Sequence, residues 1–272
     1  MRHSALALWH LLSLDAPTVA AVWTVFIAHT AGVALPWTAP AAMFLAVWML
    51  YAADRLLDAR PGTPAAELEE RHRFHHQHRR AFLTAIAIVA VPLTVLLHEI
   101  DARALHLYAL LATLLAVYLV LIHARHDHSH RLPKELAVGL FFPAAIFIPT
   151  VARAPSLRLA LLPAAILFAA VCTLNCLFVY AWEHPYPDRK LRAHWTTRWA
   201  TRHLTFLALM VVGVSAAAAC LRVPLLRAPA VACTFSATLL VLLRAYPRPM
   251  LPVPLRAAAD LVLLTPLIFL ST

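Results

Sequence analysis

Long apolar stretches separated by short polar segments repeat along the whole chain. Each stretch is close to the roughly 20 residues that a helix needs to cross the hydrocarbon core of a bilayer. The stretches are too long and too uniformly apolar for barrel strands, so helices are expected. The pattern predicts nine transmembrane helices, at residues 17–35, 39–57, 80–98, 104–124, 135–152, 158–182, 203–221, 226–244 and 255–271.

The composition agrees with this pattern. Hydrophobic residues make up 62% of the chain and charged residues only 13%, against about 25% charged residues in soluble proteins. The mean hydropathy is +0.75. We therefore expect an all-α integral membrane protein, with one polytopic membrane domain over residues 1–272 and cap loops at 58–80, 123–134 and 183–202.

The first sixteen residues, Met1 to Ala16, do not resemble a cleavable signal, because their apolar stretch is short and is broken by His10 and Asp15. An interfacial helix anchored by Trp9 is expected instead.

The formal charge of +10 is distributed unevenly between the two sides of the predicted bundle. Eighteen of the 23 lysines and arginines fall at the N-terminus or in the predicted loops on its side. This asymmetry is typical of cytoplasmic loops and predicts a multi-pass protein with a cytoplasmic N-terminus, as in a bacterial inner membrane. The basic loops would then face anionic membrane lipid or a phosphorylated substrate, and no nucleic acid partner is expected.

The second predicted span runs directly into two aspartates, Asp54 and Asp58. On a helix this spacing places both carboxylates on one face, with Cβ atoms roughly 5–6 Å apart, and Tyr51 joins that face. Two such carboxylates repel each other by about 3 kcal/mol at an effective dielectric constant near 20. A cation between them would remove the repulsion, and oxygen ligands at a helix end suit Mg²⁺. The alternative is that Asp54 pairs with a nearby arginine and Asp58 ends the helix in solvent.

The loop that follows is expected to form a helical cap. Thr63 and Pro64 are suited to begin a helix, and Arg79 and Arg80 lie near its expected far end.

A second polar site follows the sixth predicted span. Asn175 and Glu183 lie in its last turns and Asp188 follows in the loop, on the same side of the membrane as Asp58. Asp260 is the one acidic residue in the last three spans, and Arg256, one turn before it, is its expected partner.

These features together resemble the UbiA superfamily of intramembrane prenyltransferases. The resemblance is carried by nine spans and by three segments, Tyr51–Asp58, Lys134–Pro149 and Asn175–Asp188. The usual first motif is Asn-Asp-x-x-Asp-x-x-x-Asp, and Leu50 and Tyr51 occupy its first two positions here. In the second motif, Asn175, Val179 and Glu183 stand where three aspartates are usual.

The resemblance implies a UbiA-like bundle with cytoplasmic cap helices that transfers a prenyl group from a polyprenyl diphosphate to a lipophilic acceptor, with Mg²⁺ as cofactor. It implies catalytic roles for Asp54, Asp58 and Glu183. The implied metal ligands are Asp54, Asp58, Asn175, Glu183 and Asp188. The implied diphosphate-binding residues are Lys134, Arg189, Lys190 and Arg71.

The sixteen histidines support a competing interpretation. His72, His75 and His76 form a His-x-x-His-His pattern, which is typical of membrane di-iron desaturases and hydroxylases, and would share one helix face. Such enzymes need about three such boxes, whereas the second cluster, His123 to His130, is irregularly spaced. A basic, histidine-rich interfacial cap explains the same residues. A third interpretation is a family member that binds lipid without catalysis.

Overall fold

The computed structural model describes residues 4–58, 70–124, 134–184, 194–245 and 252–270, and these residues are helical with no strand among them. A helix lies on each of the nine predicted stretches. The α-helices are α1 Ala5–Leu11, α2 Asp15–Thr30, α3 Thr38–Asp58, α4 Glu70–Gln77, α5 Arg79–His98, α6 Ala102–Ala124, α7 Lys134–Arg153, α8 Arg158–Glu183, α9 Trp195–Arg202, α10 Leu204–Cys220, α11 Pro224–Ala245, α12 Pro252–Leu261 and α13 Leu267–Leu270.

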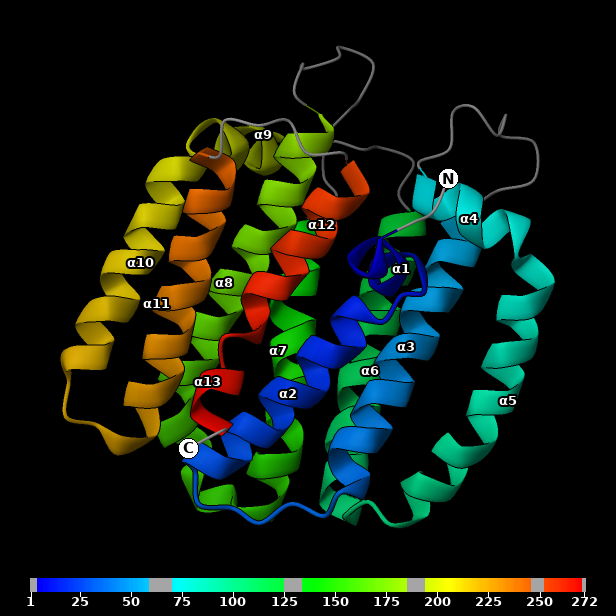
Figure 1. Ribbon diagram of the computed structural model, residues 1–272. Coiled ribbons are helices and arrows are strands. Elements are labelled where there is room, and N and C mark those ends of the chain that lie inside the picture. The colour runs from blue at the N-terminus through cyan, green and yellow to red at the C-terminus, as the bar shows by residue number, and fades with distance from the viewer. Residues whose placement is uncertain (1–3, 59–69, 125–133, 185–193, 246–251, 271–272) are drawn as a thin grey trace.

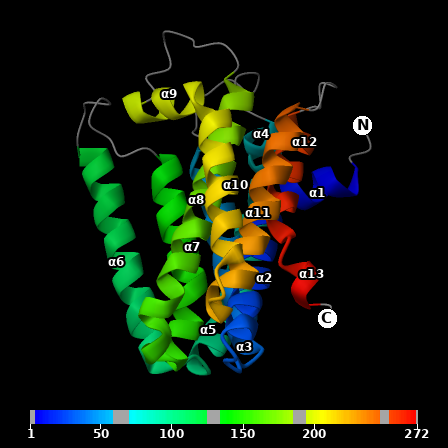
Figure 2. The same ribbon diagram turned by 90° about the vertical axis from the view of Figure 1, so that its left-hand side faces the viewer.

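The long helices run side by side in one bundle, and α4 and α9 lie at its upper end as drawn in Figure 1. Helices α3 and α8 both terminate at this upper end. The turned view shows α9 lying across the helix ends (Figure 2). The acidic ends of the second and sixth predicted spans are therefore at the same end of the molecule.

The main core lies where α2, α7, α8 and α11 pack together. The indole of Trp23 in α2 is fully buried and stacks on Phe168 of α8, with ring centroids 3.7 Å apart. Gly139 of α7 allows a close approach to α8, because a Cβ atom there would lie 3.0 Å from the Cβ atom of Thr173. Small residues permit such close helix packing in membranes.

The outer helices expose apolar side chains. Helix α5 packs against α3 and leaves Ile88, Val91 and Val95 each more than 60% exposed. Exposed aliphatic side chains in a continuous stripe are unfavourable in water but suit the hydrocarbon of a bilayer.

The prediction of one continuous ninth span at 255–271 is wrong. Helix α12 ends at Leu261 and is followed by a 3₁₀ turn over Val262–Leu264, a turn containing Pro266, and the short α13. Proline lacks the amide hydrogen that a continuous helix needs. The carbonyl groups freed by this break accept hydrogen bonds from other helices: Ser236 Oγ donates to Val262 O at 2.8 Å, and Trp23 Nε1 donates to Leu263 O at 2.8 Å. The break is thus buried in protein, where irregular backbone is tolerated at membrane depth.

The expected cap helix also differs from the prediction. Arg79 and Arg80 begin α5 instead of ending the cap helix, because the helix is interrupted at His78, between the end of α4 and the start of α5. Residues 59–69, which include the expected start of that helix at Thr63 and Pro64, lie outside the described residues.

Candidate functional site

The turn between α1 and α2 borders a buried cluster of polar side chains, which consists of His10, Asp15, Arg55 and Asp260 and is called the buried group below. Ser4 caps α1 by accepting a hydrogen bond from the amide of Ala7, and α2 leaves α1 at 88°. Ser13 in this turn has a φ of 60°, an uncommon conformation for a residue other than glycine. Its hydroxyl hydrogen-bonds Arg55 Nη1 at 3.0 Å and His75 Nε2 at 3.1 Å, which ties the turn to α3 and α4.

Helix α3 supplies donors to the carbonyl groups at the end of α1. Arg55 Nη1 donates to the carbonyl oxygen of His10 at 2.7 Å, and Trp48 Nε1 donates to that of Leu12 at 3.0 Å. These two bonds hold the C-terminal end of α1 against α3.

Asp15 begins α2 and is 1% exposed. A carboxylate is favoured at a helix N-terminus, and its Oδ1 accepts a hydrogen bond from the amide of Ala16 at 3.0 Å. Its Oδ2 contacts His10 Nδ1 closely and lies 3.5 Å from Arg55 Nη2. The free-energy cost of burying this carboxylate is therefore offset by its contacts with the N-terminus of α2, the His10 imidazole and the Arg55 guanidinium.

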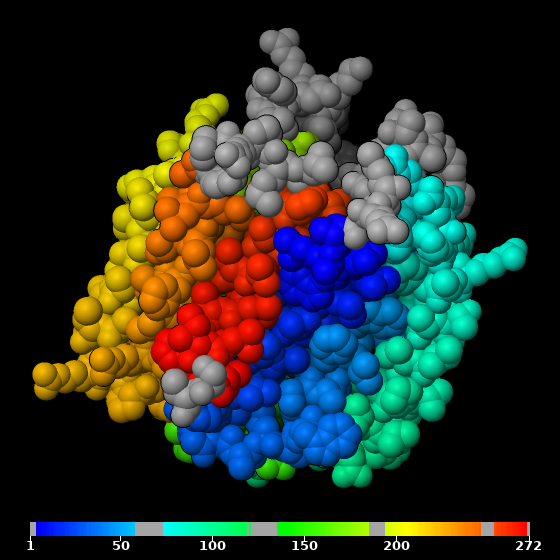
Figure 3. Space-filling view, in the orientation of Figure 1, coloured from blue at the N-terminus to red at the C-terminus, as the bar shows by residue number. Residues whose placement is uncertain are grey.

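Asp260 of α12 approaches the same group from the opposite end of the sequence. Its Oδ2 lies 4.0 Å from His10 Nδ1, and its Oδ1 accepts a hydrogen bond of 2.8 Å from Asn175 Nδ2 in α8. The side-chain atoms of His10, Asp15 and Asp260 that could bind a metal ion all lie within 4.8 Å of one another. Figure 3 shows the first helix lying against α12.

The predicted pairing of Asp260 with Arg256 is wrong. Arg256 instead forms an ion pair with Glu183 at the end of α8, and its side chain is buried. The two charges come from helices that pack together, and this tertiary contact competes with the weak local pair expected one turn away. Arg55 is likewise buried, so two of the arginines counted among the basic loop residues point into the bundle.

The predicted aspartate site is only partly described. Asp54 is exposed on the last turn of α3, and Asp58 ends that helix with a side chain outside the described part of the structure. Tyr51 does not share the exposed face, because it packs against the main core. Arg55, one turn after Tyr51, occupies the inward face at this level. Helix rotation thus directs the tyrosine and the arginine inward and Asp54 outward.

The remaining predicted ligands divide into two groups. Asn175 is buried and hydrogen-bonded to Asp260, and Glu183 is engaged by Arg256, so both are brought into other contacts. The other predicted residues lie outside the described residues or have side chains outside them: Arg71, Lys134, Asp188, Arg189 and Lys190.

The His-x-x-His-His pattern does not present one common environment. His75 is fully buried, stacks on Phe82 with centroids 4.0 Å apart and hydrogen-bonds Ser13. His76, the next residue, is exposed. The predicted shared face is therefore wrong for these two residues. The side chains of His72 and His123 fall outside the described part of the structure, as do His126, His128 and His130.

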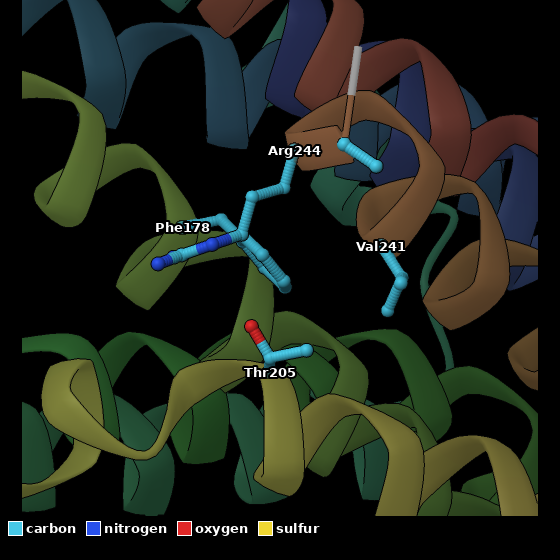
Figure 4. A pocket seen from close by; sticks show the side chains of 5 residues that line it. Phe178, Thr205, Val241 and Arg244 are labelled. Atoms are coloured by element: carbon cyan, nitrogen blue, oxygen red, sulfur yellow. The ribbon is translucent and has the colours of Figure 1, made fainter. Parts of the chain in front are cut away.

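Two hollows lie away from this group. A pocket of about 230 Å³ between α8, α10 and α11 is lined by Phe178, Thr205, Val241, Arg244 and Ala245. Figure 4 shows Arg244 beside Phe178, with the guanidinium carbon 5.9 Å from the ring centroid. A larger apolar groove of about 620 Å³ runs between α3 and α5 and is lined by Trp37, Ala41, Phe44, Leu45, Pro92, Val95 and Leu96.

Sequence reasoning did not select Asp15 and Asp260 as site residues. One signal was present in the chain, since a carboxylate within an apolar membrane segment marks a functional or paired position by default. Their proximity could not be predicted, because 245 positions separate them and only the packing of α12 on α2 joins them.

Five described helices are long and apolar enough to cross a membrane, and the number rises to seven if each of two bent helix pairs counts as one span. Together with the exposed aliphatic stripes, these helices define an α-helical membrane protein. Comparison with protein-family models, curated proteins and solved structures gives no match to this chain.

Proposed function

We propose that this chain is a Mg²⁺-dependent, UbiA-like intramembrane prenyltransferase. The proposal rests mainly on the last turn of α3, which carries Asp54 and Asp58 four residues apart at the upper end of the bundle. Helix α8 ends at the same level, and the short helices α4 and α9 border it. The substrates would be a polyprenyl diphosphate and a lipophilic acceptor.

The described residues fit Mg²⁺ in part. Asp54 is exposed and can offer carboxylate oxygens, which Mg²⁺ prefers, and Asp58 follows one turn later. Glu183 does not fit as a ligand, because Arg256 already neutralises it. The proposal therefore assigns the metal to Asp54 and Asp58 and gives Glu183 a structural role. When bound, Mg²⁺ would neutralise the charge that develops on the departing diphosphate.

The rest of α3 offers a place for an apolar chain. The groove between α3 and α5 reaches Leu45, nine residues before Asp54, which corresponds to about 14 Å along a helix axis. A prenyl diphosphate with its charged end at Asp54 could extend its hydrocarbon along α3 toward this groove. The apolar walls would keep water from the reacting carbon.

The test is equilibrium binding of labelled prenyl diphosphates of several lengths to the reconstituted protein, with and without Mg²⁺. Binding should depend on Mg²⁺ and should fall in Asp54→Asn and in Asp58→Asn, which keep side-chain size and remove the charge. Asp101→Asn, at an exposed position in the short connection between α5 and α6, is the matched control. Binding that is independent of Mg²⁺, or equal in all three variants, would end the proposal.

The basic residues expected to contact the diphosphate can be tested in the same assay. Replacing Lys134, Arg189 or Lys190 by alanine should weaken binding by about 1–3 kcal/mol if each makes a charged hydrogen bond. Unchanged affinity in all three would leave them with a role in membrane orientation only.

His76→Ala separates the prenyltransferase from the di-iron interpretation. The exposed His76 side chain is not needed by a Mg²⁺ and diphosphate site, so transfer should persist. His75 is unsuitable for this purpose because its loss would also disturb the contact with Ser13. Loss of bound iron together with activity in His76→Ala would favour the di-iron enzyme.

A further inference from the structure

The buried group around His10 is not fully hydrogen-bonded. His10 Nε2 and Asn175 Oδ1 are buried polar atoms with no hydrogen-bond partner among the described residues. His10 is 2% exposed and Asn175 is 7% exposed, so water around the protein does not supply the missing partners readily. Buried polar atoms are nearly always paired, and an ion beside His10 Nδ1 and the two carboxyl groups would give Asn175 Oδ1 a partner, whereas His10 Nε2 points away from such an ion.

Two carboxyl groups, those of Asp15 and Asp260, share this group with one guanidinium, that of Arg55. Arg55 forms an ion pair with Asp15 but its hydrogen bonds go elsewhere, because Nη1 donates to the His10 carbonyl and to Ser13 while Nη2 stays 3.5 Å from Asp15. That separation exceeds the usual 2.7–3.2 Å of such a hydrogen bond.

The spacing suits one metal ion. Ligand atoms that each lie about 2.0–2.2 Å from an ion can be at most about 4.4 Å apart. His10 Nδ1 lies 4.0 Å from Asp260 Oδ2, and the ligand atoms of His10, Asp15 and Asp260 all lie within 4.8 Å of one another. A bound ion would replace the direct contact between His10 Nδ1 and Asp15 Oδ2. A mixed set of one imidazole and carboxylates suits a first-row transition metal better than Mg²⁺ or Ca²⁺, which prefer oxygen ligands alone.

We propose that His10, Asp15 and Asp260 hold one divalent transition-metal ion such as Zn²⁺ or Mn²⁺, with the Asn175 amide oxygen as a further ligand. The ion joins α1, α2, α8 and α12, and so fixes both ends of the chain to the bundle. This site is separate from the Asp54 and Asp58 pair and does not depend on the proposed prenyl transfer.

The test uses the full chain in lipid nanodiscs, freed of metal with a chelator and held without Mg²⁺ or any diphosphate. Co²⁺ is then added, with visible d–d absorption reporting the ligand set and elemental analysis reporting the stoichiometry. One Co²⁺ per chain is expected. Asp260→Asn and His10→Gln should each weaken Co²⁺ binding by at least about 10-fold, the lower end of what loss of even an outer partner causes.

Two controls and one variant of opposite effect complete the design. His29→Gln, at an exposed histidine, and Asp101→Asn, at an exposed aspartate between α5 and α6, should bind Co²⁺ as the unmodified chain does. Asn175→Asp adds a carboxylate at the site and should bind Co²⁺ about 10-fold more tightly, a result that misfolding cannot imitate. The proposal is overturned by less than one Co²⁺ per chain, by unchanged affinity in Asp260→Asn and His10→Gln, by loss of binding in Asp101→Asn, or by no gain in Asn175→Asp.

Discussion

Replacing Arg55 by methionine isolates the contribution of one buried cation to this fold. Methionine is similarly long and apolar, so it keeps much of the packing while removing every donor. The change deletes the hydrogen bonds to the His10 carbonyl and to Ser13 and the ion pair with Asp15. Asp15 then remains as a carboxylate that is 1% exposed without its guanidinium partner.

The expected loss follows from which contacts survive. Removing one member of a buried ion pair costs about 3–5 kcal/mol, because the remaining charge stays buried. Asp15 keeps the contact with His10 and the hydrogen bond from the Ala16 amide, so the lower value applies. We expect the free energy of unfolding to fall by about 3 kcal/mol in Arg55→Met. The double variant Arg55→Met with Asp15→Asn removes the orphaned charge and should recover about 1–2 kcal/mol of that loss.

The measurement is reversible unfolding in mixed micelles, followed by tryptophan fluorescence, for the single variants, the double variant and the unmodified chain. Hydrogen exchange of the α1 amides should quicken selectively, because the contact between α1 and α3 is the one that is cut. Arg222→Met, at an exposed arginine beyond α10, should stay within about 0.5 kcal/mol of the unmodified chain. The ion pair would be refuted as a stabilising feature if Arg55→Met lowered the free energy of unfolding by less than about 1 kcal/mol. It would also be refuted if the change in the double variant equalled the sum of the changes in the two single variants.

Three further changes test other contacts by the same unfolding measurement. Gly139→Val should lower the free energy of unfolding by about 1–3 kcal/mol, because the added atoms meet Thr173 across the α7–α8 contact, and a variant as stable as the unmodified chain would show that the helices can separate freely. Glu183→Gln should cost about 3 kcal/mol by leaving Arg256 buried without its carboxylate, whereas Glu183→Asp should retain part of that stability. Ser236→Ala should cost about 1–2 kcal/mol, since the carbonyl oxygen of Val262 loses its donor at the break in the ninth segment; no change would mean that another group replaces the hydroxyl.

The sequence determined the class of protein and the positions of its helices. Hydrophobicity over about 20 residues is a local property, so the helices on the first eight predicted stretches and their approximate ends follow from the order of the residues alone. The break in the ninth stretch was signalled locally by Pro266, but its position depended on Trp23 and Ser236, which supply the hydrogen bonds that the broken backbone needs.

Only the tertiary structure decided which polar side chains meet. The four-residue spacing of Asp54 and Asp58 describes one helix face but does not show whether that face points inward, and packing turned Tyr51 and Arg55 inward instead. The spacing of Arg256 and Asp260 suggested a local pair, yet each found a partner on α8. A charge in a low-dielectric interior is stabilised by whichever opposite charge or donor the packing brings closest. Helix formation is therefore determined by neighbouring residues, whereas the group of His10, Asp15 and Asp260 exists only because the two ends of the chain pack together.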